Sequence, residues 1–410
     1  MKGAWNLKSL GSVAEFRGGG TPSTDVPDYW GGGIPWVSPK DMKSDDIGAS
    51  IDTITTEAIQ HSAASLVPTG SVLIVVRSGI LARTVPIALT TCELTVNQDI
   101  KALCPSKQLD SRYLRYFMRS EERRLLKLVT RGATVHRLST DSLKTLMVPV
   151  PPLPEQKRIV AILDEAFEGI DRAIANTKKN LANAREVFDC QVTSILMKRD
   201  LGWQDRSLDQ VCIVERGSSP RPIQDYFTTD PGGVNWIKIG DTEEGGKYVY
   251  KTAQKITPEG AKKSRYVDEG DFILTNSMSF GRPYIMKTSG YIHDGWFVLR
   301  LNDSIDPEYF YYLLSSNFVQ SQFSQLASGS VVKNISGDLV KKAVLPIPPL
   351  AQQQVIASRL SETSSGTSRL GAVYQQKLSA LGDLRQAILQ KAFAGNLTTR
   401  SVEDLHEAAQ

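Results

Sequence analysis

The side chains that most often perform chemistry in proteins are few and scattered in this 410-residue sequence. Its four histidines and four cysteines are His61, His136, His293, His406, Cys92, Cys104, Cys190 and Cys212. No two cysteines form a CxxC pair, so neither a zinc knuckle nor a disulfide framework is indicated. The sequence also lacks a GxxxxGKS/T phosphate loop, an HExxH zinc motif and an Asn-Pro-Pro-aromatic motif of amino-methyltransferases. We therefore expect no catalysis and no bound metal or cofactor.

Recognition chemistry is better represented, because Arg, Asn, Gln and Asp gather in segments expected to be loops. These side chains can read the edges of bases, and Arg and Lys also bind phosphates. The candidate nucleic-acid contacts are Thr21, Ser23, Lys40, Asp41, Arg77, Ser78, Arg83, Gln98, Arg131, Arg137, Arg216, Arg221, Lys238, Asp241, Asn276, Ser277, Arg282, Lys333 and Asn334. For any one of them, a role as a hydrogen-bonded loop anchor is an equally good interpretation. The Gly-rich run RGGGTPS at Arg17–Ser23 is interpreted as a turn.

Positive charge is local, since the whole chain carries a net charge of only +4. Residues 1–100 hold 7 basic and 10 acidic side chains, whereas residues 101–150 hold 11 basic and 4 acidic ones. Eight of these eleven basic side chains lie on or after the predicted helix, namely Arg112, Arg115, Arg119, Arg123, Arg124, Lys127, Arg131 and Arg137. The spacings of three, four, four and four from Arg112 to Lys127, through Arg115, Arg119 and Arg123, place a basic stripe on one helix face, which is either a solvated surface or a nucleic-acid contact. For the following loop, TRGATVHRLS, we favour contact with a nucleic-acid backbone.

The elements that position these residues occur twice in the sequence. The matching blocks are Trp5–Ser23 with Trp203–Arg221, Ile34–Asp41 with Val234–Asp241, Val67–Ser78 with Val267–Met278, Asp110–Ser120 with Asp306–Ser316, and Leu146–Gln156 with Ala343–Gln353. Each copy contains short β-branched runs typical of strands, such as SVLIVV and DFILT. One helix is predicted in each copy, between Asp110 and Gly132 and between Asp306 and Gly329. Trp36 and Trp236 are predicted to lie in the core.

A long helix is predicted after each Pro-rich block. Apolar or small residues alternate at intervals of four and three in the first helix, at Leu163, Phe167, Ile170, Ile174, Thr177, Leu181, Ala184, Phe188, Gln191 and Ile195. This is a coiled-coil pattern, and the proline-free stretch would span about 70 Å if continuous. The second copy contains SETSSGTS at Ser361–Ser368, a poor helix interior that leaves its continuity open. We expect the two helices to form an antiparallel pair with a globular domain at each end.

The chain resembles the specificity subunits of type I restriction-modification systems. The resemblance rests on PPLPEQKRIVAIL at Pro151–Leu163, its repeat PPLAQQQVIASRL at Pro348–Leu360, LRQAILQKAFAGNL at Leu384–Leu397, GGGTPS at Gly18–Ser23 and IPWVSPKDM at Ile34–Met42. It implies an α+β fold in which two mixed α/β target-recognition domains are separated by long antiparallel coiled-coil helices. The implied divisions are two recognition domains at 1–150 and 201–347, a central helix at 151–200 and a C-terminal helix at 348–410.

The resemblance also implies what the chain binds. Each domain would read one half of a bipartite, asymmetric site in double-stranded DNA, and the helices would set the spacer and dock two methyltransferase subunits. S-adenosylmethionine, ATP and Mg would be bound by these and by the restriction or motor subunits, not by this chain. A stand-alone modification enzyme and a coiled-coil scaffold without DNA binding are the alternatives. With no signal peptide and no apolar run long enough to span a membrane, a cytoplasmic location is expected.

Overall fold

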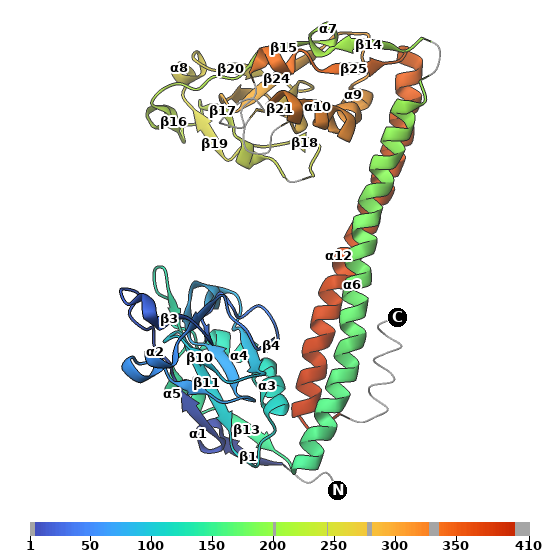
Figure 1. The fold of residues 1–410 in the computed structure, drawn as a ribbon. Helices are drawn as coiled ribbons and strands as arrows, with labels where there is room; N and C mark the ends of the chain where they lie inside the picture. Colours follow the sequence, from blue (N-terminus) through green and yellow to red (C-terminus); the bar gives the residue numbers. More distant parts are fainter. Residues whose placement is uncertain (1–4, 200–201, 244, 277–280, 328–335, 398–410) are drawn as a thin grey trace. The chain divides into compact units, whose positions relative to one another are not determined.

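The computed structural model describes residues 5–199, 202–243, 245–276, 281–327 and 336–397. The chain divides into two compact units, one made of Met1–Lys178 and Gln376–Gln410, the other of Lys179–Gln375. Each unit contains one copy of the repeat (Figure 1). Each also contains about half of the two long helices, α6 (Leu153–Met197) and α12 (Leu350–Phe393).

The first unit is built on two sheets. One has the order β2 (Ala14–Arg17), β11 (Ile100–Pro105), β7 (Val72–Val75), β9 (Ile87–Thr90), β4 (Asp46–Ile47). The other has the order β5 (Asp52–Ile54), β3 (Trp30–Val37), β10 (Leu94–Val96), β6 (Leu66–Val67). Two ribbons pair β1 (Asn6–Ser9) with β13 (Met147–Val150) and β8 (Arg77–Ser78) with β12 (His136–Arg137). The short helices are α1 (Leu10–Val13), α2 (Thr56–His61), α3 (Ser111–Ser120), α4 (Glu122–Lys127), α5 (Thr140–Lys144), η1 (Pro27–Tyr29) and η2 (Gly79–Ala82).

The second unit repeats this plan. One sheet has the order β15 (Cys212–Arg216), β24 (Trp296–Leu301), β21 (Phe272–Thr275), β22 (Pro283–Met286), β18 (Tyr248–Val249). The other has the order β16 (Phe227–Thr228), β19 (Gln254–Ile256), β17 (Val234–Ile237), β23 (Gly290–Ile292), β20 (Arg265–Val267), and β14 (Gln204–Ser207) pairs with β25 (Val344–Ile347). The short helices are α7 (Leu208–Val211), α8 (Pro258–Ala261), α9 (Pro307–Ser315), α10 (Asn317–Ala327), α11 (Gly337–Val340), η3 (Ile223–Tyr226) and η4 (Ile239–Asp241).

The sheets confirm the internal repeat. The parallel pairs β3–β10 and β4–β9 of the first unit have parallel counterparts, β17–β23 and β18–β22, in the second. The runs predicted as buried strands form β7 and β21, and all their residues are buried. Trp36 and Trp236 lie in the core, as predicted. An edge strand, β16, extends the second unit's sheet beyond β19, the counterpart of β5.

Each repeat has two helices where the sequence predicted one. Asp110 and Asp306 cap α3 and α9 as expected, accepting hydrogen bonds from main-chain N–H groups with their carboxylates. In the second repeat, however, the helix is interrupted at Ser316, where the backbone is extended. The Ser316 hydroxyl then caps the start of α10 by accepting a hydrogen bond from Val319 N at 3.3 Å. The first repeat breaks at Glu121, between α3 and α4. The predicted helix end at Gly329 lies outside the described residues.

A buried glutamine in the first turn of each long helix connects the preceding Pro-rich block to the rest of the unit. Oε1 of Gln156 accepts from Asp110 N at 2.8 Å, and its Nε2 donates to the carbonyls of Gln108 and Pro151 at 2.9 and 2.8 Å. Gln353 makes the same three bonds in the second unit, at 2.8 to 3.0 Å. Each amide therefore ties the start of α3 or α9 to the first turn of α6 or α12.

The helix α12 is continuous through Ser361–Ser368, which resolves the question that its composition left open. The hydroxyl of Thr363 donates to the carbonyl of Arg359 at 3.0 Å, and that of Thr367 to the carbonyl of Thr363 at 3.0 Å. Such bonds to the preceding turn let hydroxyl side chains remain within a helix without competing for its main-chain donors.

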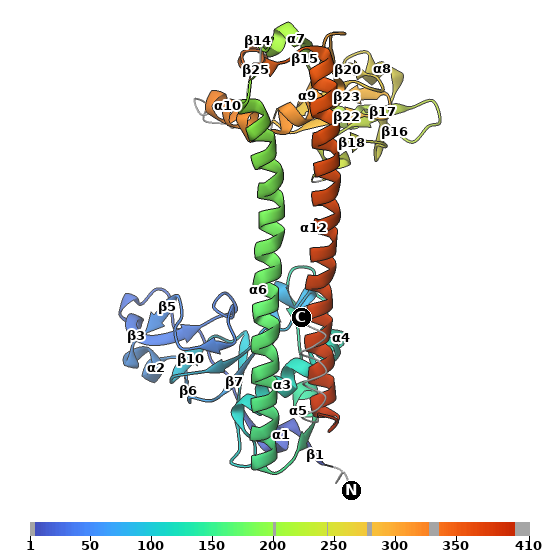
Figure 2. The same cartoon turned by 90° about the vertical axis from the view of Figure 1, so that its right-hand side faces the viewer.

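Within the first unit, α6 and α12 pack in opposite directions. Arg158 near the start of α6 donates to the carbonyl of Leu397 at 3.4 Å, while Asp171 further along pairs with Arg385. Figures 1 and 2 show these two helices alongside each other. The predicted apolar positions Leu163, Phe167 and Ile170 lie in the core, and Leu381, Ile388 and Leu389 of α12 are buried in the same core cluster.

Within the second unit, the buried face of α6 shifts by one residue from the predicted pattern. Val192 and Leu196 are buried with Ala357 and Leu360 of α12, whereas the predicted Gln191 and Ile195 are only partly buried. Here the helix also packs on the globular part of the unit. The ring of Phe188, for example, lies 5.9 Å from that of Tyr312.

Candidate nucleic-acid interface

Loops from separate strands meet to form a first loop cluster, which comprises Thr21, Arg77, Gln98, Asp99 and Arg137. The Thr21 hydroxyl donates to Oε1 of Gln98 at 2.7 Å. Arg77 donates its main-chain N–H to the Asp99 carbonyl at 3.2 Å, and its guanidinium lies 3.9 Å from the Asp99 carboxylate. Arg137 lies opposite Arg77 in the β8–β12 ribbon. All but the half-buried Asp99 are exposed, so the cluster presents polar and cationic groups to solvent.

A second loop cluster occupies the equivalent place in the second unit and comprises Arg216, Ser219, Arg221, Asn276 and Asp294. Asn276 donates its main-chain N–H to the Gly295 carbonyl at 2.9 Å, as its counterpart Val76 does to the Asp99 carbonyl at 2.8 Å. The Ser219 hydroxyl donates to Asp294 Oδ1 at 2.7 Å, as Thr21 does to Gln98. The two clusters thus share a main-chain framework but carry different side chains.

Glycine is required where these loops approach each other. A Cβ added at Gly19 would lie 1.7 Å from the carbonyl oxygen of Val96, and one added at Gly217 would lie 2.1 Å from that of His293. Neither backbone contact could be relieved by moving a flexible side chain. The Gly-rich run is therefore a site of close backbone packing; its backbone is irregular from Gly18 to Ser23, and a turn follows at residues 24–25.

Several candidates act as loop anchors. Asp41 accepts from Ser38 N at 2.8 Å and Ile51 N at 2.9 Å, and Asp241 accepts from Lys238 N at 2.7 Å and Ala253 N at 2.9 Å. Three other candidates have anchoring contacts. Lys40 pairs with Asp52 at 2.7 Å, and Ser78 caps η2. Asn276 is only 2% exposed, and its Nδ2 donates to the Asp294 carbonyl at 2.7 Å. These contacts favour the anchoring interpretation for these residues.

The other candidates are more accessible. Thr21, Ser23, Arg77, Arg83, Gln98, Arg131, Arg137, Arg216, Arg221 and Arg282 are exposed, and Lys238 is half-buried. The structure brings Arg77, Gln98 and Arg137 together in the first cluster and Arg216 and Arg221 together in the second. Ser277, Lys333 and Asn334 lie outside the described residues.

Acidic side chains pair with most of the basic residues of this segment, and four of these five pairs join residues distant in sequence. The pairs are Arg112 with Asp164 at 2.9 Å, Arg115 with Asp46 at 2.8 Å, Arg119 with Asp45 at 2.6 Å, Arg123 with Asp383 at 3.2 Å and Arg124 with Glu121 at 3.2 Å. The prediction of a solvated face is wrong for Arg115, which is only 4% exposed. Lys127 at the end of α4 is also exposed, as are Arg131 and Arg137 beyond the helices, and these cations suit phosphate contact.

Burial and charge set the protonation of the second cluster. Burial lowers the pKa of His293, an effect that the neighbouring Asp294 carboxylate opposes. The hydrogen bond from Ser219 lowers the pKa of Asp294, with further help from His293 and Arg221. Asp294 is therefore a carboxylate at neutral pH. Neither Ser219 nor Asp294 was predicted from the sequence as a contact, although the alignment of Ser219 with Thr21 indicates the first.

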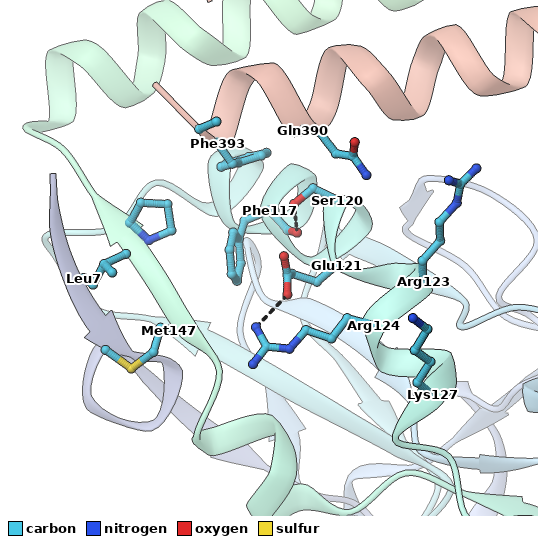
Figure 3. A pocket seen from close by; sticks show the side chains of 12 residues that line it. Leu7, Phe117, Ser120, Glu121, Arg123, Arg124, Lys127, Met147, Gln390 and Phe393 are labelled. Carbon is cyan, nitrogen blue, oxygen red and sulfur yellow. Dashed lines mark hydrogen bonds and ion pairs between the residues drawn. The ribbon is translucent and has the colours of Figure 1, made fainter. Parts of the chain in front are cut away.

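A hollow of about 510 Å³ in the first unit was not foreseen from the sequence (Figure 3). Its apolar lining includes Leu7, Phe117, Met147 and Phe393, and its cations are Arg123, Arg124 and Lys127. Over the described ranges, no three His, Cys, Asp or Glu side chains are grouped so as to hold a metal ion. No helix within those ranges has the length and apolar character needed to cross a membrane.

Comparisons with known proteins identify the family. Residues 2–183 and 201–378 match the type I restriction modification DNA specificity domain. The EcoR124I/EcoR124II specificity subunit of Escherichia coli is 36% identical over 196 residues, 46% of this chain and 48% of that protein. The MjaIX specificity subunit of Methanocaldococcus jannaschii is 28% identical over 244 residues, 54% of this chain and 55% of that protein. The matched part of this chain thus spans about half the length of these relatives.

Solved structures share the fold. A chain from work on complex assembly and conformational transition of the type I R-M system superposes with a TM-score of 0.77, at 19% identity, covering 96% of this chain and 99% of that one. The HsdS subunit from Thermoanaerobacter tengcongensis superposes with a TM-score of 0.54, at 20% identity, covering 96% and 98%. Because the family match extends over most of both repeats and the fold agrees, the chain belongs to the type I restriction-modification DNA specificity family.

Proposed function

We propose that this chain is the non-catalytic DNA-recognition subunit of a type I restriction-modification complex, and that each repeat reads one half of a bipartite, asymmetric site. The observation that carries the proposal is the pair of loop clusters at equivalent positions in the two units. Their shared main-chain framework with different exposed side chains suits two modules that read different bases.

The exposed side chains divide into two expected roles. Arg131 and Arg137 are proposed to contact phosphates, because a guanidinium on a loop can approach the DNA backbone closely. Arg77, Gln98 and Arg221 are proposed to read base edges, since Arg suits guanine and Gln suits adenine in the major groove. The remaining candidates would support these contacts as anchors or additional phosphate ligands.

The long helices are proposed to set the spacer between half-sites and to dock two methyltransferase subunits. Val187 on α6 and Val355 and Val373 on α12 are 57 to 61% exposed, and exposed apolar side chains suit a protein partner. Restriction or motor subunits would join the same complex. S-adenosylmethionine, ATP and Mg would be bound by these partners. The proposed divisions of the chain remain 1–150, 151–200, 201–347 and 348–410.

The methylated-base pattern of host DNA tests the proposal, with the gene present and deleted. A bipartite motif should disappear on deletion. Exchange of residues 1–150 for the matching domain of a relative should then change one half of the motif only. A change in both halves, with folding intact, would contradict independent reading. The purified chain alone should transfer no label from S-adenosylmethionine to DNA, which separates it from a stand-alone modification enzyme. It should retard DNA in a mobility-shift assay, which a coiled-coil scaffold without DNA binding would not do.

A further inference from the structure

Asp294 lies where three segments of the second loop cluster meet. Its carboxylate accepts from the Ser219 hydroxyl at 2.7 Å, and its N–H donates to the same hydroxyl at 3.3 Å. Its carbonyl accepts from Nδ2 of Asn276 at 2.7 Å and from Nε of Arg216 at 3.4 Å. One residue therefore joins the segments that follow β15, β21 and β23.

An exposed cation lies beside this junction. Nη2 of Arg221 is 3.7 Å from Oδ2 of Asp294, and the Arg221 side chain is 84% exposed. A long, exposed side chain loses rotamer freedom when it binds DNA, and a carboxylate that holds it beforehand reduces this entropic cost. The carboxylate also places a negative charge where phosphates would approach.

The first loop cluster has an uncharged residue at the same junction, and its carboxylate, Asp99, lies one position further along, 3.9 Å from the Arg77 guanidinium. Thr21 corresponds to Ser219 and Gln98 to Asp294, and the hydroxyl of Thr21 donates to the amide oxygen of Gln98 at 2.7 Å. A neutral amide is therefore sufficient to join the two loops. The charge of Asp294 needs a different explanation from the joining of the loops.

We propose that Asp294 is a positioning residue for DNA recognition, whose carboxylate orients Arg221 toward a base edge of the second half-site and repels phosphates that approach in the wrong register. This rests on the DNA-recognition function proposed above. It predicts that removal of one charge has opposite effects on specific and non-specific binding, which a purely structural role would not produce.

The test uses the full chain and two duplexes, one selected by the wild-type chain from a randomised pool and one shuffled version of it. D294N should weaken binding to the selected duplex about tenfold, the scale of one lost base contact. Binding to the shuffled duplex should strengthen about twofold, since a negative charge near the phosphates is lost. R221A should weaken binding to the selected duplex similarly, and the double variant should be no worse than R221A.

D303N is the matched control, because Asp303 is exposed and follows the opposite end of β24 from Asp294. It should leave the ratio of the two affinities unchanged. S219A removes the hydroxyl bond but keeps both charges. It should preserve most of the ratio of the affinities for the two duplexes, and it provides a second test if D294N does not fold. Equal weakening on both duplexes, or additive effects of D294N and R221A, would overturn the proposal. If the wild-type chain selects no duplex, the proposed function itself fails, and this inference with it.

Discussion

At the residue scale, the decisive property of a cation here is whether an acid reaches it. The sequence shows Arg112, Arg115 and Arg119 on one helix face, but it cannot show that Asp164, Asp46 and Asp45 meet them in the fold. Local spacing predicted the helix face, while its partners depend on tertiary contacts. The same reason explains why the burial of Asn276 could not be foreseen.

Arg131 and Arg137 should contribute to affinity without setting sequence choice. Replacing both with Ala should reduce the slope of log K against log salt by about two, since each phosphate contact contributes roughly 0.9. The measurement is titration of the selected duplex at several salt concentrations. Replacing Arg112 and Arg119 removes the same charge from paired positions, and this control should leave the slope nearly unchanged. A control slope that falls equally would show that general charge, not contact, is measured.

The buried amides of Gln156 and Gln353 should be important for stability. Replacing either with Ala removes three hydrogen bonds and leaves buried main-chain groups unpaired. The free energy of unfolding should fall by about 3 kcal/mol in urea denaturation. Q354A, at the adjacent exposed position, should change it by less than about 0.5 kcal/mol. Equal effects at 353 and 354 would contradict the role assigned to the buried amide.

Acid should destabilise the second unit partly through His293. Its pKa is lower in the fold than the ordinary value of 6.5, so the unfolded chain takes up the proton first as the pH falls. Stability from this residue is therefore complete above about pH 7 and declines below 6.5, by at most about 1.4 kcal/mol per pH unit. H293N cannot titrate, but its amide oxygen can accept from Gly295 N–H. Urea denaturation at pH 7 and 5.5 should show a smaller loss in H293N, and an equal loss would contradict the assignment.

At the element scale, the residues that cap helices could be predicted from the sequence, whereas the breaks between helices could not. Asp110, Asp306 and Pro307 have short-range preferences for helix starts, so the beginnings of α3 and α9 could be predicted. The break at Ser316 depends on a hydroxyl bond that forms only when α10 begins. Conversely, Ser361–Ser368 is helical despite its weak local preference, and the turn that precedes it is anchored in the core by Ala357 and Leu360.

The continuity of α12 can be tested at Gly366. This glycine lies within the helix, and a Cβ added there would meet no atom within 4 Å. G366A should therefore raise the free energy of unfolding by about 0.5–1 kcal/mol, because alanine favours the helix more strongly. Thermal or urea denaturation measures the change. G217A, whose Cβ would meet backbone, is the contrasting variant and should destabilise the second unit. Destabilisation by G366A would instead indicate that a helix break at Gly366 is needed.

At the scale of the whole molecule, duplication was the most readable feature. Five blocks recur in order, and the two units have corresponding sheets. The coiled-coil pattern also predicted the partners of α6, apart from the shift to Val192 and Leu196. The bases that each cluster is proposed to read could not be predicted, because side chains on loops have no fixed correspondence to bases.

The spacer between half-sites should follow helix length. One heptad added to α6 beside Leu181 and one to α12 beside Gly371, residues that face each other, preserves the packing and adds about 10 Å. The unspecified spacer should grow by up to about three base pairs, because each adds roughly 3.4 Å. Mapping methylated sites measures it, and the bases in each half should stay the same. An active variant with the original spacer would show that the partner subunits fix the separation.

The main-chain hydrogen bonds of the two clusters have a consequence for evolution. Three main-chain hydrogen bonds hold the loops through atoms that every non-proline residue possesses. They join the N–H of Asn97 to the carbonyl of Val37, that of Arg77 to the carbonyl of Asp99, and that of Asn276 to the carbonyl of Gly295. Exposed side chains on these loops can therefore drift under mutation at little cost in folding. Substitution of these exposed side chains is therefore expected to leave the loop framework intact, whereas substitution of Gly19 or Gly217 would disturb it.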